Sequence, residues 1–180
     1  FLFESDKGLY RNSGQDSSPR IVRAMVINRE TGETFDVHVN LREESIQSCE
    51  KPLVGQAPML IDEFESLGDL VKSNQKWIDA MRERGITDTS HLQIDPWAVG
   101  NMGFVKYEGR RLAGAICWAR LFPDDNGYAR PVEGVLAILD LVTQEVLDVF
   151  DFGARPIPIK SGNYSPDVVE SFRTDIKPIE

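Results

Sequence analysis

Residues 132–153, VEGVLAILDLVTQEVLDVFDFG, decide the fold of this 180-residue chain. Two apolar runs, at 134–142 and 145–153, flank the polar pair Thr143-Gln144. Short apolar runs on either side of a turn are typical of β-strands. The stretch therefore predicts a β-hairpin with a tight turn, the unit from which antiparallel sheets are built.

Two more strands are predicted upstream of the hairpin, HLQIDPW at 91–97 and RRLAGAICWARLF at 110–122. They follow the one segment with convincing helical periodicity. Its apolar residues recur at spacings of three, four and six: Ile61, Phe64, Leu67, Val71, Trp77, Ile78 and Met81. A helix laid across the sheet would bury Phe64, Val71 and Met81.

This helical segment contains a break and a defined end. Ser73 or Asn74 is suited to cap a second helix, because either side chain accepts a hydrogen bond from a helical first turn. RERG at 82–85 ends that helix with basic residues and a glycine at the C′ position. The acidic residues at the start favour the positive end of the helix dipole and need no catalytic explanation: Asp62, Glu63 and Glu65.

A separate sheet is predicted nearer the N-terminus, from strands at 20–28, 34–41 and, more weakly, 45–50. The middle strand alternates, so we expect a buried face of Phe35, Val37, Val39 and Leu41 and a wet face of Thr34, Asp36, His38 and Asn40. Proline and glycine mark 51–58 as a linker. The order of sheet, linker, helix and sheet indicates an α+β protein of two small units, the first without a helix of its own in this chain.

Composition and charge exclude several classes of protein. With 41% hydrophobic and 27% charged residues, the chain can bury one core or two small ones. The net charge of −9 disfavours nucleic acid as a partner and is compatible with a cationic ligand. No apolar run is long enough for a membrane span.

The first ten residues, FLFESDKGLY, have neither the basic region nor the long apolar region of a signal peptide. The chain opens abruptly on apolar residues, so we expect that sequence precedes it, and we expect a cytoplasmic protein. Cys49 and Cys117 are far apart and form no CxxC motif. Two buried free thiols are favoured over one disulfide.

Catalytic motifs are scarce. The only histidines, His38 and His91, are not in a metal-binding or hydrolytic pattern. Residues 124–127, Asp-Asp-Asn-Gly, begin like a calcium loop but lack its ligand spacing, so a polar hairpin turn is the better interpretation. Three aromatic residues near loops and element ends remain unexplained, and they would suit either the core or a hydrophobic wall for an aromatic ligand: Phe64, Trp97 and Tyr128.

The segment from 126 to 167, NGYARPVEGVLAILDLVTQEVLDVFDFGARPIPIKSGNYSPD, and RTDIKPIE at 173–180 resemble the copper-containing amine oxidases. The resemblance covers essentially the whole chain and is most specific from Tyr128 to Glu180. Further matches occur along the chain: DEFE at 62–65, AMRERGI at 80–86, IDPWAVG at 94–100 and EGRRLAGAICWARLF at 108–122. FESDKG near the start departs from the family's usual Glu-Pro.

The resemblance implies two cystatin-like units. Residues 1–55 would be the C-terminal part of the family's N2 domain, 56–160 its N3 domain, and 161–180 the linker toward a catalytic domain that this sequence lacks. That absent domain is the implied partner, and an exposed apolar patch is expected where it would dock. The parent enzyme would be a homodimer.

The implied activity is oxidation of primary amines to aldehyde, ammonia and hydrogen peroxide, with copper held by three histidines and with topaquinone made from a tyrosine. Both cofactors would belong to the absent domain. Asn163-Tyr164-Ser165 lacks the acidic residue of the cofactor-forming motif. We therefore expect no catalytic, cofactor-binding or metal-binding residue here and no activity from this chain alone.

The residues that match the family's amine channel are Phe64, Pro96, Trp97 and Tyr128. An aromatic or arylalkyl amine such as tyramine is the expected substrate. Two other hypotheses stay open: a stand-alone cystatin-like module that binds a partner protein through its sheet, and a small hydrolase that uses His91.

Overall fold

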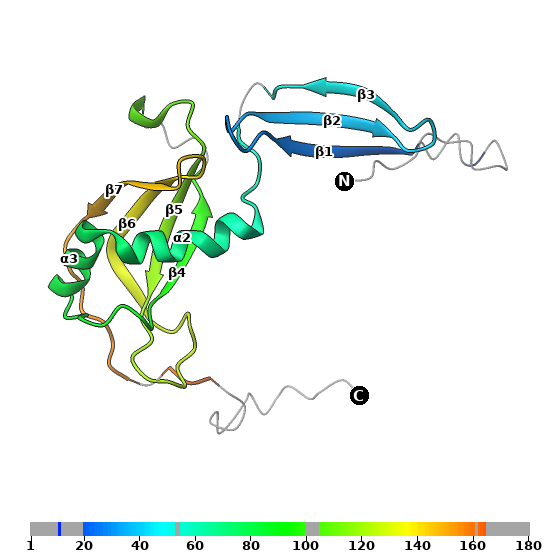
Figure 1. Cartoon of the computed structure of the whole chain (residues 1–180). Coiled ribbons are helices and arrows are strands. Elements are labelled where there is room, and N and C mark those ends of the chain that lie inside the picture. The colour runs from blue at the N-terminus through cyan, green and yellow to red at the C-terminus, as the bar shows by residue number, and fades with distance from the viewer. Residues whose placement is uncertain (1–10, 12–19, 53–54, 100–104, 161, 165–180) are drawn as a thin grey trace, which may run out of the picture. The chain divides into compact units, whose positions relative to one another are not determined.

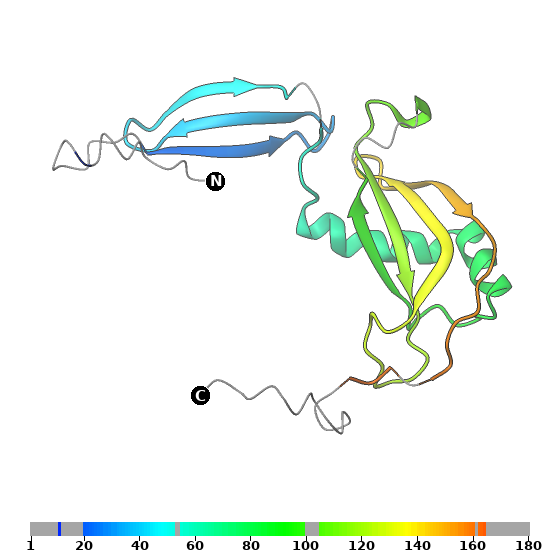
Figure 2. The same cartoon turned by 180° about the vertical axis from the view of Figure 1, so that it is seen from behind.

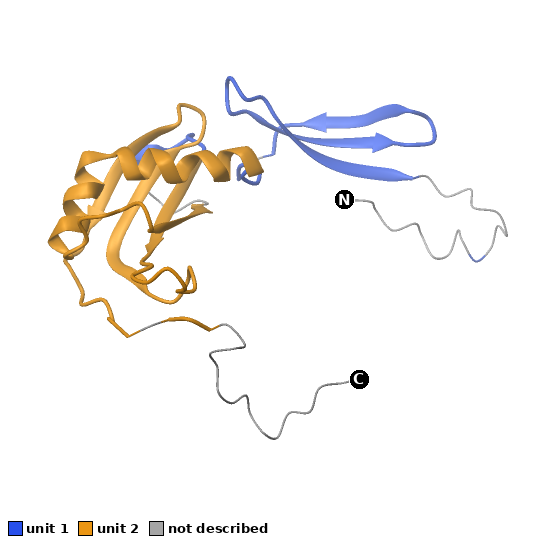
Figure 3. Ribbon diagram, turned by 60° about the horizontal axis from the view of Figure 1, so that its bottom comes forward, with its two compact units in different colours: residues 1–59, 100–111 blue, residues 60–99, 112–180 orange. Residues whose placement is uncertain are grey.

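The computed structural model describes residues 11, 20–52, 55–99, 105–160 and 162–164. The chain divides into two compact units, shown in blue and orange in Figure 3. Unit 1 comprises residues 1–59 and 100–111, and unit 2 comprises residues 60–99 and 112–180. The domain boundaries expected from the resemblance stay a prediction, and most of the linker expected at 161–180 lies outside the described residues.

Unit 1 contains a three-stranded antiparallel sheet with the order β1-β2-β3. Its strands are β1 (Ile21–Ile27), β2 (Thr34–Asn40) and β3 (Ser45–Glu50), as the sequence predicts. Residues 20–52 consist of strands and turns only. A short 3₁₀ helix, η1 (Val105–Tyr107), also belongs to this unit.

The expected division of β2 into one buried and one wet face is wrong. Thr34 and Asn40 are buried although they are polar, whereas Leu41 is 46% exposed. Both polar side chains bind backbone groups, which satisfies them inside the unit. The Thr34 hydroxyl accepts the Ala57 N–H at 3.0 Å, and the Asn40 side chain accepts two N–H groups of the turn that follows it.

Unit 2 places two helices on one face of a four-stranded antiparallel sheet, as Figures 1 and 2 show from opposite sides. The sheet has the order β4-β5-β6-β7. The elements are α2 (Ile61–Ser73), α3 (Gln75–Glu83), β4 (Gln93–Ala98), β5 (Leu112–Trp118), β6 (Pro131–Asp140) and β7 (Glu145–Asp151). The α+β fold with two antiparallel sheets is thus confirmed. No helix in the described part of the chain is long and apolar enough to cross a membrane.

The helix ends follow the sequence signals. The Glu63 carboxylate accepts the Leu60 N–H at 2.7 Å and so caps the start of α2. Asn74 separates the two helices, and its side chain accepts the Trp77 N–H at 3.2 Å. Gly85 follows α3 with a φ of 77°, a left-handed conformation that lets the chain turn away from the helix.

The core of unit 2 lies between the helices and the sheet. The helices contribute large side chains and the sheet mostly small ones, and all of them are nearly inaccessible: Leu67, Val71, Trp77, Met81, Ala115, Ala137 and Leu139. Small residues on the sheet let the helices approach closely. The expectation that this core also contains Phe64 is wrong, because Phe64 is 42% exposed.

The two cysteines have different environments. Both are free thiols, and Cys117 of β5 is buried as expected. Cys49 is exposed on β3, so the expectation of a second buried thiol is wrong. Burial raises the pKa of the Cys117 thiol to about 12.

Candidate functional site

Trp97 lies on the outer face of the unit 2 sheet, away from the helices. Successive side chains of a strand point to opposite faces, and the neighbouring residues Ile94 and Pro96 belong to the helix side. Trp97 is 63% exposed. Its Nε1–H donates to the Asp95 carboxylate at 3.0 Å, and Asp95 is itself buried. An exposed indole is therefore held in one orientation by a buried acceptor.

Gly114 of β5 lies directly opposite Trp97. A Cβ at Gly114 would lie 3.2 Å from a Val99 methyl carbon and 3.4 Å from a Leu136 methyl carbon. The absence of a side chain at this position lets the neighbouring apolar groups close in beside Trp97. Ile116, two residues further along β5, is paired with Asp95 and is 36% exposed. The outer face next to Trp97 thus consists of apolar side chains around the buried Asp95 carboxylate.

Pro96 is buried, unlike Trp97. It shares the helix side with Ile94, whose Cβ lies 3.8 Å from the place that a Cβ on Gly68 of α2 would occupy. β4 is an edge strand of its sheet, where proline is tolerated because its missing N–H removes no central ladder bond. Pro96 therefore shapes β4 rather than presenting a surface.

Phe64 lies near the start of α2, about one helical turn before Gly68. Gly68 packs against Ile94, so α2 passes beside the edge strand β4. Phe64 itself is 42% exposed.

Tyr128 lies in the connection between β5 and β6, residues 119–130. Its ring meets Trp118 edge-on, with 5.3 Å between ring centroids and 74° between the planes, and it is 51% exposed. The neighbouring Gly127 approaches Gln93, because a Cβ at Gly127 would lie 2.6 Å from the Gln93 side-chain oxygen. Tyr128 is therefore fixed next to the first residue of β4.

The structure thus places Trp97 on β4, Tyr128 next to the first residue of β4 and Phe64 near the start of α2, and it buries the fourth predicted residue, Pro96. The three rings do not form one cluster, because Trp97 is four residues from Gln93, a distance of about 13 Å along a strand. A separate pocket of about 170 Å³ lies between the start of α3 and β7, lined by Asn74, Gln75, Lys76 and residues 146–149.

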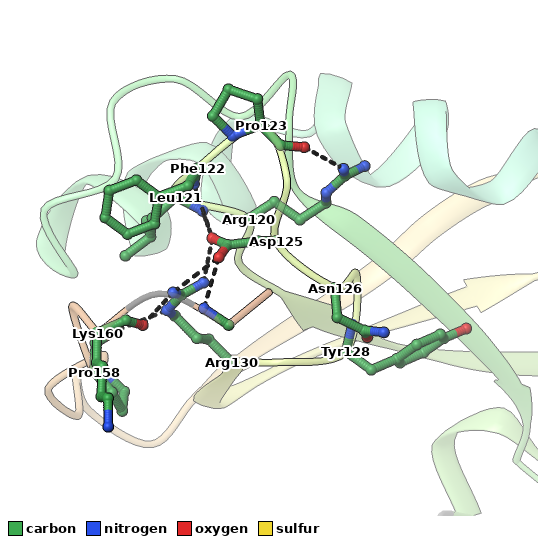
Figure 4. Close-up of polar contacts among 11 residues, drawn as sticks. Arg120, Leu121, Phe122, Pro123, Asp125, Asn126, Tyr128, Arg130, Pro158 and Lys160 are labelled. Atoms are coloured by element: carbon green, nitrogen blue, oxygen red, sulfur yellow. Dashed lines mark hydrogen bonds and ion pairs between the residues drawn. The ribbon is translucent and has the colours of Figure 1, made fainter. Parts of the chain in front are cut away.

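The sequence analysis did not predict a buried ion pair in the connection between β5 and β6, which Figure 4 shows. The polar turn expected at 124–127 exposes Asp124 and buries Asp125. Asp125 pairs with Arg130, and the two residues are only 3% and 2% exposed. The guanidinium holds the pKa of the Asp125 carboxyl well below its usual range, although burial opposes this shift. The sequence signal for this ion pair was an acidic and a basic residue, Asp125 and Arg130, five positions apart on either side of Asn126-Gly127.

Histidines form no site within the described part of the chain. His91 is exposed, and the His38 Nε2 lies 3.6 Å from an Asp36 carboxylate oxygen in unit 1. No group of three His, Cys, Asp or Glu side chains among the described residues is placed to hold a metal. These residues therefore do not fit a three-histidine copper centre.

Comparisons with known proteins agree on one family. Residues 62–165 match the family model of the copper amine oxidase N3 domain. The chain is 33% identical over 157 residues to a primary amine oxidase of Arthrobacter sp. (strain P1), a match that covers 87% of this chain and 24% of that protein. It is 33% identical over 180 residues to the peroxisomal copper-containing diamine oxidase 1 of Nicotiana tabacum, covering 89% of this chain and 23% of that protein.

Histamine oxidase of Arthrobacter globiformis is 28% identical over 174 residues, covering 94% of this chain and 25% of that protein. Among solved structures, a copper-containing benzylamine oxidase from Hansenula polymorpha has a similar fold, with a TM-score of 0.66 and 14% identity. That alignment covers 94% of this chain and 28% of the oxidase. The chain thus spans about a quarter of the length of the relatives that it matches.

Proposed function

Because the chain belongs to the copper amine oxidase family, whose N3 domain it matches over residues 62–165, we propose that it is the N-terminal part of a primary amine oxidase. The complete enzyme would convert a primary amine, water and oxygen to an aldehyde, ammonia and hydrogen peroxide. Copper and topaquinone would supply the redox chemistry there. This chain would supply structure and part of the route by which the amine enters.

The route would pass along β4. Phe64, Trp97 and Tyr128 would offer aromatic surfaces, and Pro96 would fix the course of the strand. Exposed aromatic residues on β4 and next to its first residue favour an aromatic or arylalkyl amine such as tyramine, because ring-ring contacts select for aromatic ligands. A net charge of −9 also favours the approach of a protonated amine.

The observation that carries this proposal is the Trp97–Asp95 contact. A freely moving surface tryptophan loses conformational freedom when it binds a ligand, and this loss weakens binding. The hydrogen bond to a buried carboxylate fixes the ring beforehand. Such an arrangement suits a wall that recognises substrates.

The test compares two exposed aromatic residues of unit 2 in the complete oxidase, Trp97→Ala and Phe152→Ala. Phe152 follows β7 at the opposite edge of the sheet and is 70% exposed. We expect Trp97→Ala to change the ratio of kcat/KM for tyramine to that for methylamine by about 2- to 10-fold, the range of one aromatic contact. Phe152→Ala should leave the ratio unchanged. The proposal fails if neither substitution alters the ratio.

A stand-alone binding module remains the alternative, and the gene distinguishes the two. We expect coding sequence to continue past the codon for Glu180 and to include an Asn-Tyr-Asp/Glu motif. A stop codon within a few codons would contradict the proposed oxidase.

A further inference from the structure

The loop that carries Tyr128 is attached to a second segment of unit 2 through the buried Asp125–Arg130 ion pair. We call residues 121–130 the aromatic loop, and residues 154–163, without the undescribed residue 161, the strap. The strap has no helix or strand and follows β7. Figure 4 shows the ion pair of the loop between Tyr128 and the strap.

Arg130 holds the strap from inside the unit. Its Nε donates to the Pro158 carbonyl at 2.8 Å, and an Nη donates to the Lys160 carbonyl. The same guanidinium binds both oxygens of Asp125, with one contact at 3.1 Å. Since its side chain is 2% exposed, water cannot replace these acceptors without opening the site. A buried charge that loses its partners is strongly destabilising.

Asp125 holds the loop and the strap together. Its carboxylate accepts the Gly162 N–H of the strap at 2.8 Å. It also accepts the N–H groups of Leu121 and Phe122 at 3.0 and 2.8 Å, which belong to the loop. One buried carboxylate therefore depends on donors from both segments.

The turn that carries Tyr128 lies between these two ionised residues. The Tyr128 N–H donates to the Asn126 side chain at 2.9 Å, and the Ala129 N–H donates to the Asn126 carbonyl at 3.1 Å. The Asn126 N–H in turn donates to the Gly162 carbonyl of the strap at 3.0 Å. The backbone on both sides of Tyr128 is thus bound to Asn126, and Asn126 is bound to the strap.

Gly162 allows the two segments to lie in direct contact. A Cβ at Gly162 would lie 2.3 Å from the Ala129 Cβ, far inside a normal contact. Ala129 is next to Tyr128 in the sequence. Any side chain at position 162 must therefore push the strap away from the turn that carries Tyr128.

We propose that Asp125 and Arg130 are positioning residues that form a latch, which makes the placement of the Tyr128 ring depend on attachment of the strap. Release of the strap removes two acceptors from Arg130 and one donor from Asp125. The pair then rearranges, and the turn between its members moves with it. The role in substrate selection rests on the proposed function, whereas the latch itself does not.

The first experiment uses the 180-residue chain and trypsin. Trypsin cleaves the peptide bond between Lys160 and Ser161, and Arg130 binds the carbonyl oxygen of that bond. We therefore expect cleavage only when the strap opens. Arg130→Lys keeps the charge but loses the two-pronged guanidinium geometry. Loss of one hydrogen bond to a charged group should speed this cleavage about tenfold or more. Arg120→Lys is the matched control, because Arg120 lies directly before the aromatic loop, is exposed and binds only the Pro123 carbonyl among the contacts in Figure 4.

The second experiment follows the Tyr128–Trp118 pair by near-UV circular dichroism. Tyr128→Leu removes the signal of this pair in the wild-type chain. In the Arg130→Lys and Gly162→Ala backgrounds, adding Tyr128→Leu should change the spectrum little, because the ring has already moved. Gly162→Ala opens the strap without altering any charge, and it carries the test if Arg130→Lys does not fold.

The outcomes separate the latch from the proposed function. The latch is wrong if cleavage after Lys160 stays slow in both variants, or if cleavage is fast while the signal of Tyr128 persists. In the complete oxidase, Tyr128→Ala should raise KM for tyramine relative to methylamine, and Arg130→Lys should do the same at unchanged kcat. If Tyr128→Ala has no effect, the proposed channel role fails. If Tyr128→Ala raises the KM ratio and Arg130→Lys does not, the positioning role of Arg130 fails.

Discussion

The two sheets contain the same hairpin in different surroundings. In unit 1 the hairpin joins β2 to β3, and in unit 2 it joins β6 to β7. Asn40 ends β2 and Asp140 ends β6, and each side chain accepts the N–H groups of the residues two and three positions later. The two hairpins are thus similar at the level of single hydrogen bonds.

The hairpins agree in backbone detail as well. The fourth residue after each cap is left-handed, Glu44 with a φ of 48° and Gln144 with a φ of 54°. Each hairpin also shifts register at the same point, between His38 and Val39 and between Ile138 and Leu139. Local polar contacts therefore fix the turn in the sheet that helices cover and equally in the sheet of unit 1.

The surroundings differ. Leu139 is completely buried in unit 2, while Val39 at the same place in unit 1 is half-buried. Two helices cover the sheet of unit 2, and the described part of unit 1 has only Val37 as a buried aliphatic strand residue. The comparison teaches that the hairpin is set by its own sequence and that its stability depends on what packs against it.

The ion pairs give the largest expected contrast between the units. Arg130→Ala leaves Asp125 buried without its partner and should destabilise unit 2 by about 3–5 kcal/mol. Arg23→Ala in unit 1 removes the bond to Asp36, but the Arg23 side chain is 46% exposed. Such exposed pairs contribute little. Urea unfolding of both variants measures the contrast, and equal losses would refute the difference in burial.

Truncation at the matched hairpin position is the next contrast. Leu139→Ala should cost about 2–5 kcal/mol, because it leaves a cavity in a closely packed core. Val39→Ala should cost less than half as much, since its side chain is already partly hydrated. Thermal unfolding followed by circular dichroism measures both, and a larger loss for Val39→Ala would overturn the assignment of the main core to unit 2.

The turn caps should, in contrast, behave alike. Asn40→Ala and Asp140→Ala each leave two turn N–H groups without their acceptor, and each should cost about 1–3 kcal/mol. Asp140→Asn is the control, because an amide oxygen accepts the same bonds. Losses that differ widely between Asn40→Ala and Asp140→Ala would show that the two hairpins are not equivalent.

The smallest expected effect is a difference in reactivity between the two cysteines, which needs no substitution. A thiol reagent at pH 8 should modify Cys49 in the folded chain and leave Cys117 unreacted, because burial raises the pKa of Cys117 and keeps the reagent out. Two thiols should react after unfolding in guanidinium. Modification of Cys117 in the native chain would indicate that unit 2 opens at β5.

Much of this fold could be predicted from the sequence because its signals are local. The cap at Asn74, the glycine after α3 and the turn at 143–144 all depend on neighbouring residues. The α+β class followed from the order of these elements. Burial was less predictable, since Phe64 has the spacing of a core residue and yet is 42% exposed.

The candidate site was only partly predictable. The resemblance pointed to Trp97 and Tyr128, and the structure exposes both rings. The contact between Asp125 and the strap joins residues 37 positions apart. No periodicity marks such a contact, and an acidic residue beside Asn-Gly has the composition of an ordinary solvated turn. Only the folded chain shows that this turn contains a buried charge.

Pro96 has a consequence for how unit 2 behaves at high concentration. The outer strand of an open sheet can pair with a strand of another molecule, which leads to aggregation. β4 is such an outer strand, and its proline lacks the N–H that a newcomer would need as a donor at that position. The residue that shapes β4 beside the exposed aromatic rings therefore also protects this edge against self-association.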